Sequence, residues 1–73
     1  MPSLPVISGD EAIRALSRAA FVVVTQRGSH VKLRHADGRV VIVPRHRELR
    51  RGTLASVLRQ ARLTVEELLD LLA

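Results

Sequence analysis

The stretch from Gln26 to Arg34, QRGSHVKLR, places a single histidine among cations. His30 follows a Gly-Ser pair, and Arg27, Lys32 and Arg34 all lie within four residues of it. A neutral imidazole can accept a proton close to neutral pH, and neighbouring cations can hold a phosphate and stabilise the charge that grows on it. These residue types suit the cleavage of RNA, in which a histidine activates a ribose 2′-OH for attack on the adjacent phosphate. On residue chemistry alone, an ordinary surface histidine is the more frequent explanation.

A second group of candidate phosphate contacts lies further along the chain. Arg45 and His46 belong to a polar, basic loop, in which His46 is a phosphate contact, a second acid or base, or a plain surface residue. Arg50 and Arg51 precede the Gly52-Thr53 helix start, where free backbone N–H groups can bind an anion. The alternative for that helix start is an ordinary cap without a ligand.

The charge distribution indicates a polyanionic partner. The net charge is +5, and ten of the twelve Lys and Arg residues lie in residues 27–62, whereas residues 63–73 are mildly acidic. Nearly all the cations are arginine, whose planar fork suits phosphate, so nucleic acid is the first candidate. Phe21 is the only aromatic residue. Bases therefore cannot stack on aromatic rings, and we expect contacts mainly to backbone phosphate, with weak base specificity.

The composition also limits cofactors and compartment. The chain has no cysteine, which excludes disulfides and Cys-based zinc sites. Its carboxylates are too few and scattered for a two-metal centre, so we expect no metal or other cofactor. No apolar run approaches the ~20 residues of a membrane span, and the N-terminus lacks the pattern of a signal peptide. We expect one domain over residues 1–73, cytoplasmic and without a membrane partner.

Three helices are expected around these residues. Ser8–Glu11 reads as a capping box, and the apolar residues that follow have helical spacing for about three turns. A second helix starts at Gly52-Thr53 with one apolar face. Thr64–Glu67 is another capping box, and it begins a short last helix rich in leucine. That helix either packs on the sheet or offers its leucines to a partner.

Three strands are expected between the first two helices. They cover residues 21–25, 29–36 and 39–43, with an Asp37-Gly38 hairpin turn between the last two and Pro44 ending the third. The order is helix, three-stranded antiparallel meander, helix and short helix. This order indicates an α+β layer fold in which the helices cover one face of the sheet and leave the other face open.

Strand alternation assigns the candidate residues to faces of the sheet. The apolar set of the second strand must face the helices, and it comprises Val31 and Leu33 together with Ser29. The polar set shares the open face, and it comprises His30, Lys32 and Arg34, with Arg27 nearby at the turn. His35 lies an odd number of residues from His30 and should point to the opposite face. We therefore do not expect those two histidines to form an acid–base pair.

Three segments of the chain carry a resemblance to a known family. They are Gly-Ser-His at residues 28–30, a strand followed by Pro-x-His at 40–46, and Gly-Thr-Leu at 52–54 with LRQA at 58–61. In this order and spacing the chain resembles the HicA family of toxins, small RNA-cleaving proteins of bacterial and archaeal toxin–antitoxin pairs. The likeness extends from SGDEAIRAL near the start to VEELLDLLA at the end.

The resemblance implies a double-stranded-RNA-binding-domain-like fold with helix, three strands and helix. It implies an endoribonuclease, or mRNA interferase, that cleaves mRNA, blocks translation and is neutralised by a HicB-type antitoxin. The catalytic histidine of the family falls on His30. The family often has glycine where this chain has Ala20, and phenylalanine where it has Leu68 or Leu69. RNA-contacting roles follow only from position and charge, and we assign them to Arg27, Ser29, Lys32, Arg34, Arg45, His46, Arg50 and Arg51.

Two other functions use the same residues. A non-catalytic RNA-binding module would dock its basic face on A-form RNA by shape and phosphate contacts, without cleavage. A protein whose main role is its antitoxin complex would have the basic face covered by an acidic partner. The sequence leaves both alternatives open.

Overall fold

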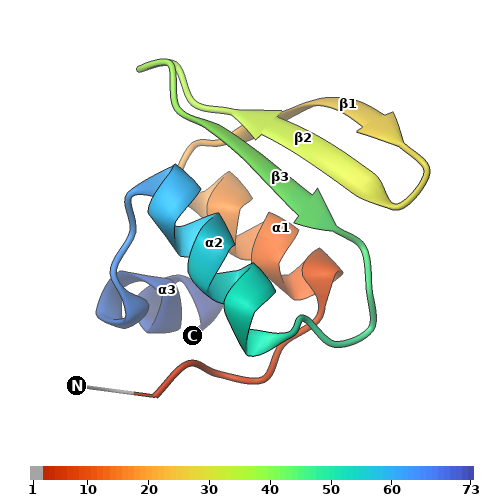
Figure 1. Cartoon of the computed structure of the whole chain (residues 1–73). Coiled ribbons are helices and arrows are strands. Elements are labelled where there is room, and N and C mark those ends of the chain that lie inside the picture. The colour runs from red at the N-terminus through yellow and green to blue at the C-terminus, as the bar shows by residue number, and fades with distance from the viewer. Residues whose placement is uncertain (1–2) are drawn as a thin grey trace.

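The computed structural model describes residues 3–73, which form three helices and one antiparallel sheet (Figure 1). The elements are α1 (Gly9–Arg18), β1 (Val22–Arg27), β2 (His30–Arg34), β3 (Val40–Pro44), α2 (Arg51–Ala61) and α3 (Val65–Leu72). The strand order is β1-β2-β3, so each strand pairs with its neighbour in sequence. The predicted α+β layer fold is confirmed, and it has the helix–sheet–helix layout of double-stranded-RNA-binding domains.

Two tight turns fix the register of the sheet. A two-residue turn joins β1 to β2, with Arg27 opposite His30 and Gly28 at a φ of 56° that suits glycine. The second hairpin has a three-residue loop that ends at Gly38, whose φ is 99°, and the His35 N–H donates to the Arg39 carbonyl at 2.9 Å.

The strand bounds differ modestly from the prediction. The second strand begins at His30 and ends at Arg34, because Ser29 and His35 belong to the turns. Pro44 is the last residue of β3 rather than the residue after it. The first strand begins after Phe21, whose side chain is buried in the core, and continues to Arg27.

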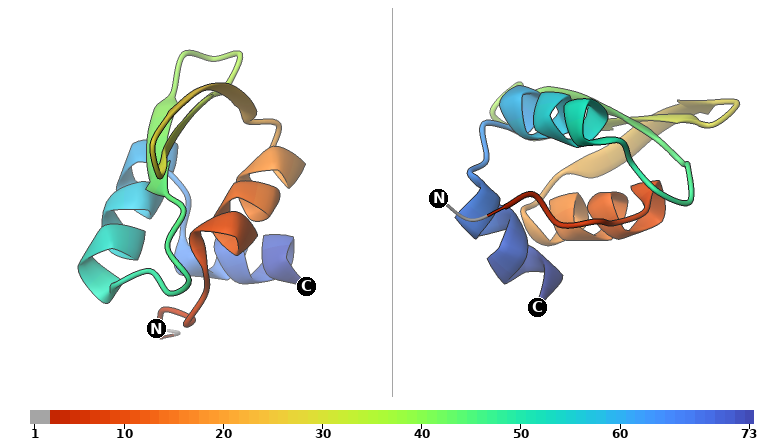
Figure 2. Two further views of the ribbon diagram at one scale, coloured as in Figure 1. Left: turned by 90° about the vertical axis from the view of Figure 1, so that its right-hand side faces the viewer. Right: turned by 60° about the horizontal axis from the view of Figure 1, so that its bottom comes forward.

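The core lies between one face of the sheet and the helices α1 and α2 (Figure 2). Val31, Leu33, Val41 and Val43 of the sheet are buried there, because alternate side chains of β2 and β3 point to the helices. The opposite face of the sheet carries no helix (Figure 2), as predicted.

Both predicted capping boxes are present. The Ser8 hydroxyl accepts the Glu11 N–H at 3.0 Å, and the Glu11 carboxylate accepts the Ser8 N–H at 3.0 Å. Thr64 and Glu67 repeat this reciprocal pair at the start of α3. The helix α3 packs on α1, with Leu68 buried and Leu69 exposed, rather than on the sheet as one of the two predicted alternatives had it.

Gly9 docks the start of α1 on the chain that follows β3. A Cβ atom at Gly9 would lie 2.0 Å from the Pro44 carbonyl oxygen, so only glycine fits this approach. The Gly9 N–H donates to the His46 carbonyl at 2.9 Å. This contact brings Asp10 of α1 close to Arg45.

Candidate functional site

His30 begins β2 at the end of the sheet where the first hairpin turns. In the register of the strands, it lies between Arg27 on β1 and Pro44 on β3. Lys32 lies between Thr25 and Ile42 in the same way. Since directly opposed residues share a face and lie about 5 Å apart at Cβ, Arg27 and Lys32 flank His30 on the open face.

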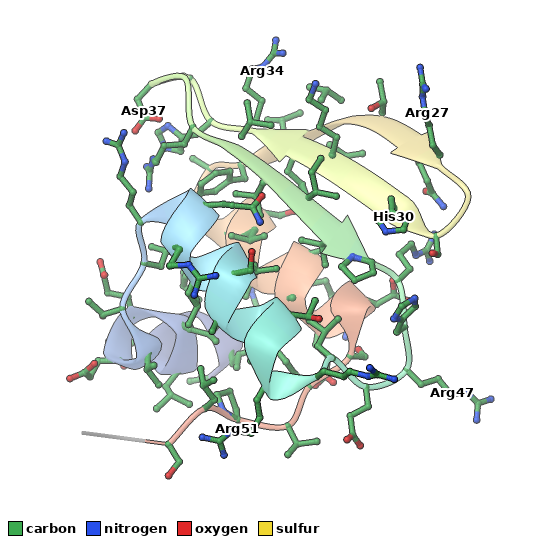
Figure 3. The ribbon with its side chains drawn as sticks, viewed as in Figure 1. Arg27, His30, Arg34, Asp37, Arg47 and Arg51 are labelled. Atoms are coloured by element: carbon green, nitrogen blue, oxygen red, sulfur yellow. The ribbon has the colours of Figure 1, made fainter. Side chains whose placement is uncertain are left out.

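The open face is hollowed beside His30. The hollow has a volume of about 280 Å³, and it is lined by Thr25, Arg27, His30, Lys32 and Ile42. None of these side chains is acidic, and no ion pair within residues 3–73 engages the two cations or the histidine. His30 is exposed, and Figure 3 shows Arg27 and Arg34 projecting from the same side of the sheet. The hollow therefore offers an anion an accessible imidazole with cations beside it.

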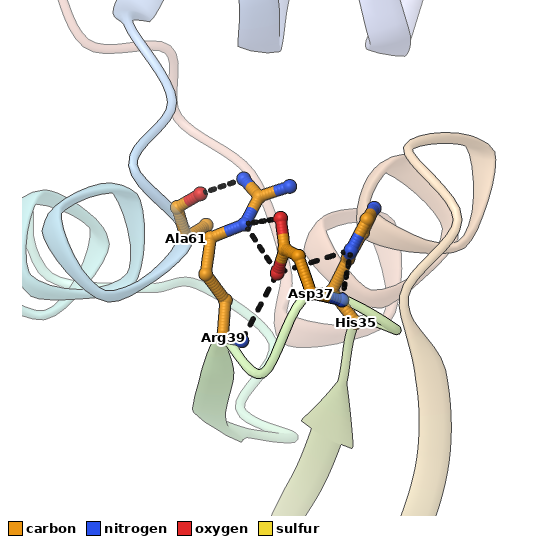
Figure 4. A network of polar contacts seen from close by, with 4 residues as sticks. All are labelled: His35, Asp37, Arg39 and Ala61. Atoms are coloured by element: carbon orange, nitrogen blue, oxygen red, sulfur yellow. Dashed lines mark hydrogen bonds and ion pairs between the residues drawn. The ribbon is translucent and has the colours of Figure 1, made fainter.

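His35 lies on the core side of the sheet and does not join this group. Its ring packs edge-on against the buried Phe21, with the ring centroids 5.2 Å apart (Figure 4 shows its polar contacts). Its Nδ1 accepts the Asp37 N–H at 3.1 Å. The prediction that His35 points away from His30 is confirmed, because His35 contacts the buried Phe21 whereas His30 lines the hollow of the open face.

Arg39 is held by the second hairpin and by α2. Its Nε donates to the Asp37 carboxylate at 2.9 Å, and its Nη1 donates to the Ala61 carbonyl (Figure 4). Its guanidinium also lies 5.0 Å from the centre of the Phe21 ring. The side-chain hydrogen bond from Arg39, with a further one from its backbone, lowers the pKa of Asp37 from 3.8 to about 2. Arg39, one of the ten cations of residues 27–62, therefore has a structural role.

Arg45 is also paired. Its guanidinium donates to the Asp10 carboxylate at 2.7 and 3.3 Å, which raises the pKa of Arg45 and lowers that of Asp10. This ion pair has no signal in the sequence, because Asp10 is 35 residues away and reaches Arg45 only through the docking of Gly9. The charge of Arg45 is thus partly neutralised before any ligand arrives.

The remaining candidates form a separate group. Arg50 is the N-cap of α2, which has no side-chain cap and no acidic residue in its first turn. Figure 3 shows Arg51 at the opposite end of the view from Arg34, and neither Arg51 nor Arg59 of α2 lines the hollow. His46 is exposed in the loop, and Ser29 is half-buried, with its carbonyl accepting the Arg45 N–H at 2.7 Å.

Neither a metal-binding cluster nor a membrane-spanning helix is found in residues 3–73. No group of three or more His, Cys, Asp or Glu side chains in that range is arranged to hold a metal ion. No helix there is long and apolar enough to cross a bilayer.

The fold and the open face define a small α+β domain whose uncovered sheet surface carries a histidine between cations. The model of the family described as "HicA toxin of bacterial toxin-antitoxin" matches residues 9–63, and the chain belongs to that family. Membership makes it the toxin of a toxin–antitoxin system with a cognate antitoxin as its partner. A search of curated proteins found no significant match to the chain.

Proposed function

We propose that this toxin is an endoribonuclease that cleaves mRNA and thereby blocks translation, with His30 as its general base. The observation that carries the proposal is the hollow in the open face, where Arg27 and Lys32 flank an exposed imidazole. No carboxylate lines this hollow, so the binding site favours a phosphate group over a cation.

The proposed reaction is a transesterification within the RNA strand. A ring nitrogen of His30 takes the proton of the ribose 2′-OH, and the 2′ oxygen attacks the adjacent phosphorus. The P–O5′ bond breaks, and the leaving 5′ oxygen takes a proton from the solvent or from a neighbouring acid. The products are a 2′,3′-cyclic phosphate and a 5′-OH end.

The cations supply electrostatic stabilisation in this scheme. Arg27 and Lys32 contact the phosphate whose negative charge grows in the transition state, and Arg34 extends the binding surface along β2. His46, Arg50 and Arg51 contact the strand beyond the scissile phosphate in this proposal, and the half-buried Ser29 and the paired Arg45 contribute less.

The donor set supports a metal-independent reaction. No carboxylate lines the hollow, and Asp10 and Asp37 are engaged elsewhere, with Arg45 and Arg39. The transition-state charge is therefore matched by arginine and lysine rather than by a bound divalent ion.

The proposal is tested with purified protein and RNA in EDTA. We expect the wild-type protein to cut the RNA, and His30→Ala to lose at least about 100-fold in rate, since general base catalysis contributes 10²–10⁴-fold. Circular dichroism and thermal unfolding should be unchanged, because His30 is exposed. A folded His30→Ala protein with the wild-type rate would refute the role of His30, and saturable binding of intact RNA would favour a non-catalytic RNA-binding module.

A further inference from the structure

The strand β1 is the least covered part of the sheet. On the helix side, Val23 shares a row with Leu33 and Val41, because the register places these three residues opposite one another. Leu33 and Val41 are fully buried, yet Val23 is 47% exposed. The helices therefore cover β2 and β3 but leave Val23 and Gln26, on the helix side of β1, open to solvent.

A groove runs beneath β1 on this side. It lies between α1 and the sheet, has a volume of about 280 Å³, and is lined by the apolar Ile13, Val23 and Val31 together with the polar Arg14 and Gln26. The ion pair between Asp10 and Arg45 lies at its border. The groove is thus separate from the hollow around His30, which opens on the other face of the sheet.

The two edges of the sheet differ in access. On β3, the Ile42 N–H donates to the side-chain carbonyl of Gln60 on α2 at 2.9 Å, so a helix side chain occupies that edge. β1 forms the other edge, and within residues 3–73 it pairs only with β2 (Figure 1). Exposed edge strands are usually shielded by charges, prolines or bulges, and β1 has a bulge at Val24 but no charge or proline before Arg27. Val22, Val23 and Val24 are all more than 40% exposed.

We infer that the free edge of β1 is the docking site of the antitoxin, which adds a strand there. Alternate side chains of an added strand point to opposite faces of the sheet. The inward ones would enter the groove against Val23, and the outward ones would lie beside Arg27 and Lys32. The fitting strand therefore alternates apolar and acidic residues. This inference rests on the partner assigned by family membership and adds the surface and the chemistry of docking.

Charge favours this occupant over a second copy of the chain. Pairing β1 with itself would join two sheets that each carry Arg27, Lys32 and Arg34, and net charge of one sign disfavours self-association. The chain as a whole carries a net charge of +5, which adds to that repulsion. An acidic strand would be attracted by this positive charge, whereas a second copy of the chain would be repelled by it.

The test uses the full-length toxin and its cognate antitoxin, with Val23→Lys as the variant. Val23 is half exposed, so the variant should fold, and its inward position leaves the His30 hollow intact. We expect antitoxin binding, measured by calorimetry, to weaken by roughly tenfold or more. Val6→Lys, at a position that is 75% exposed and outside the sheet, is the matched control and should bind normally. RNA cleavage by Val23→Lys should match wild type but resist inhibition by the antitoxin.

Hydrogen exchange gives a second readout. In the wild-type complex, backbone amides of β1 should become protected, because an added strand pairs with the free edge. Unprotected β1 amides in a stable complex, or wild-type affinity of Val23→Lys, would overturn the inference and leave the ribonuclease proposal untouched. A toxin that pairs β1 with itself and excludes the antitoxin would also overturn it. If His30→Ala cleaved RNA at the wild-type rate, the calorimetry and the hydrogen exchange would still test the docking site.

Discussion

Ion pairs within the chain decide which of the ten cations in residues 27–62 can contact a ligand. Arg39 and Arg45 lie in the same stretch of sequence as Arg27 and Lys32, but each holds a carboxylate of the protein itself. Arg27 and Lys32 instead line the hollow beside His30. The functional charge of the open face is therefore smaller than the composition suggests, and it is concentrated beside the histidine.

Lys32→Met tests the phosphate-binding role at the residue scale. The variant keeps the length of the side chain and removes its charge, so RNA cleavage should fall by about 10- to 100-fold. The slope of log affinity against log salt should decrease by about 0.7 to 1, as expected for one lost phosphate contact.

Arg59→Met is the matched control for that charge, because Arg59 is exposed on α2 and does not line the hollow. It should change cleavage and the salt slope less than Lys32→Met, as fluorescence anisotropy and rate measurements would show. Equal effects of the two variants would mean that only the net charge matters.

Asp37→Asn tests the hairpin contact through pH. Arg39 lowers the pKa of Asp37 to about 2 in the folded protein, so the ionised carboxylate stabilises the fold above its ordinary pKa of 3.8. That contribution is lost as the pH falls from about 4 to about 2. The melting temperature of wild type should therefore drop more steeply than that of the variant in this range. Parallel curves for the two proteins would contradict the role of the pair.

At the scale of the elements, the turn between α1 and β1 contains a strained backbone conformation. Ala20 follows the C-cap of α1 with a φ of 71°, a conformation that favours glycine. The glycine that the resemblance to the HicA family implies at this position would adopt the positive φ without strain. The Phe21 N–H still donates to the Leu16 carbonyl at 3.0 Å, so the chain makes the turn despite the alanine.

Ala20→Gly should therefore stabilise the protein by about 0.5–1 kcal/mol, the strain relieved minus the added freedom of the unfolded chain. Ala36→Gly is the control, because Ala36 is exposed and its φ is not positive. It should destabilise by about 0.4–1 kcal/mol. Urea unfolding measures both changes, and a loss of stability in Ala20→Gly would show that the turn carries no strain.

At the scale of the whole molecule, local patterns predicted the elements and the faces of the sheet. The capping boxes at Ser8 and Thr64, the Asp37-Gly38 turn and the alternation around His30 are all short-range features, and the structure contains each of them. The separation of His35 from His30 follows from the same alternation.

Contacts between residues far apart in the sequence could not be predicted from local patterns. The run Val22–Val24 has the composition of a buried strand, and only the placement of the helices reveals that it is exposed. The pair between Asp10 and Arg45 depends on the close approach of Gly9 to Pro44. The position of Arg51 away from the hollow depends on the direction of α2.

The central claim is that His30 activates a ribose 2′-OH on the open face. The most direct measurement uses an RNA oligonucleotide with one mapped cleavage site, compared with the same oligonucleotide carrying a single 2′-deoxy nucleotide there. We predict cleavage of the all-ribose strand to 2′,3′-cyclic phosphate and 5′-OH ends in EDTA, with no cut at the deoxy position and none by His30→Ala. Cleavage at the deoxy position, or products with a 5′-phosphate, would contradict the account.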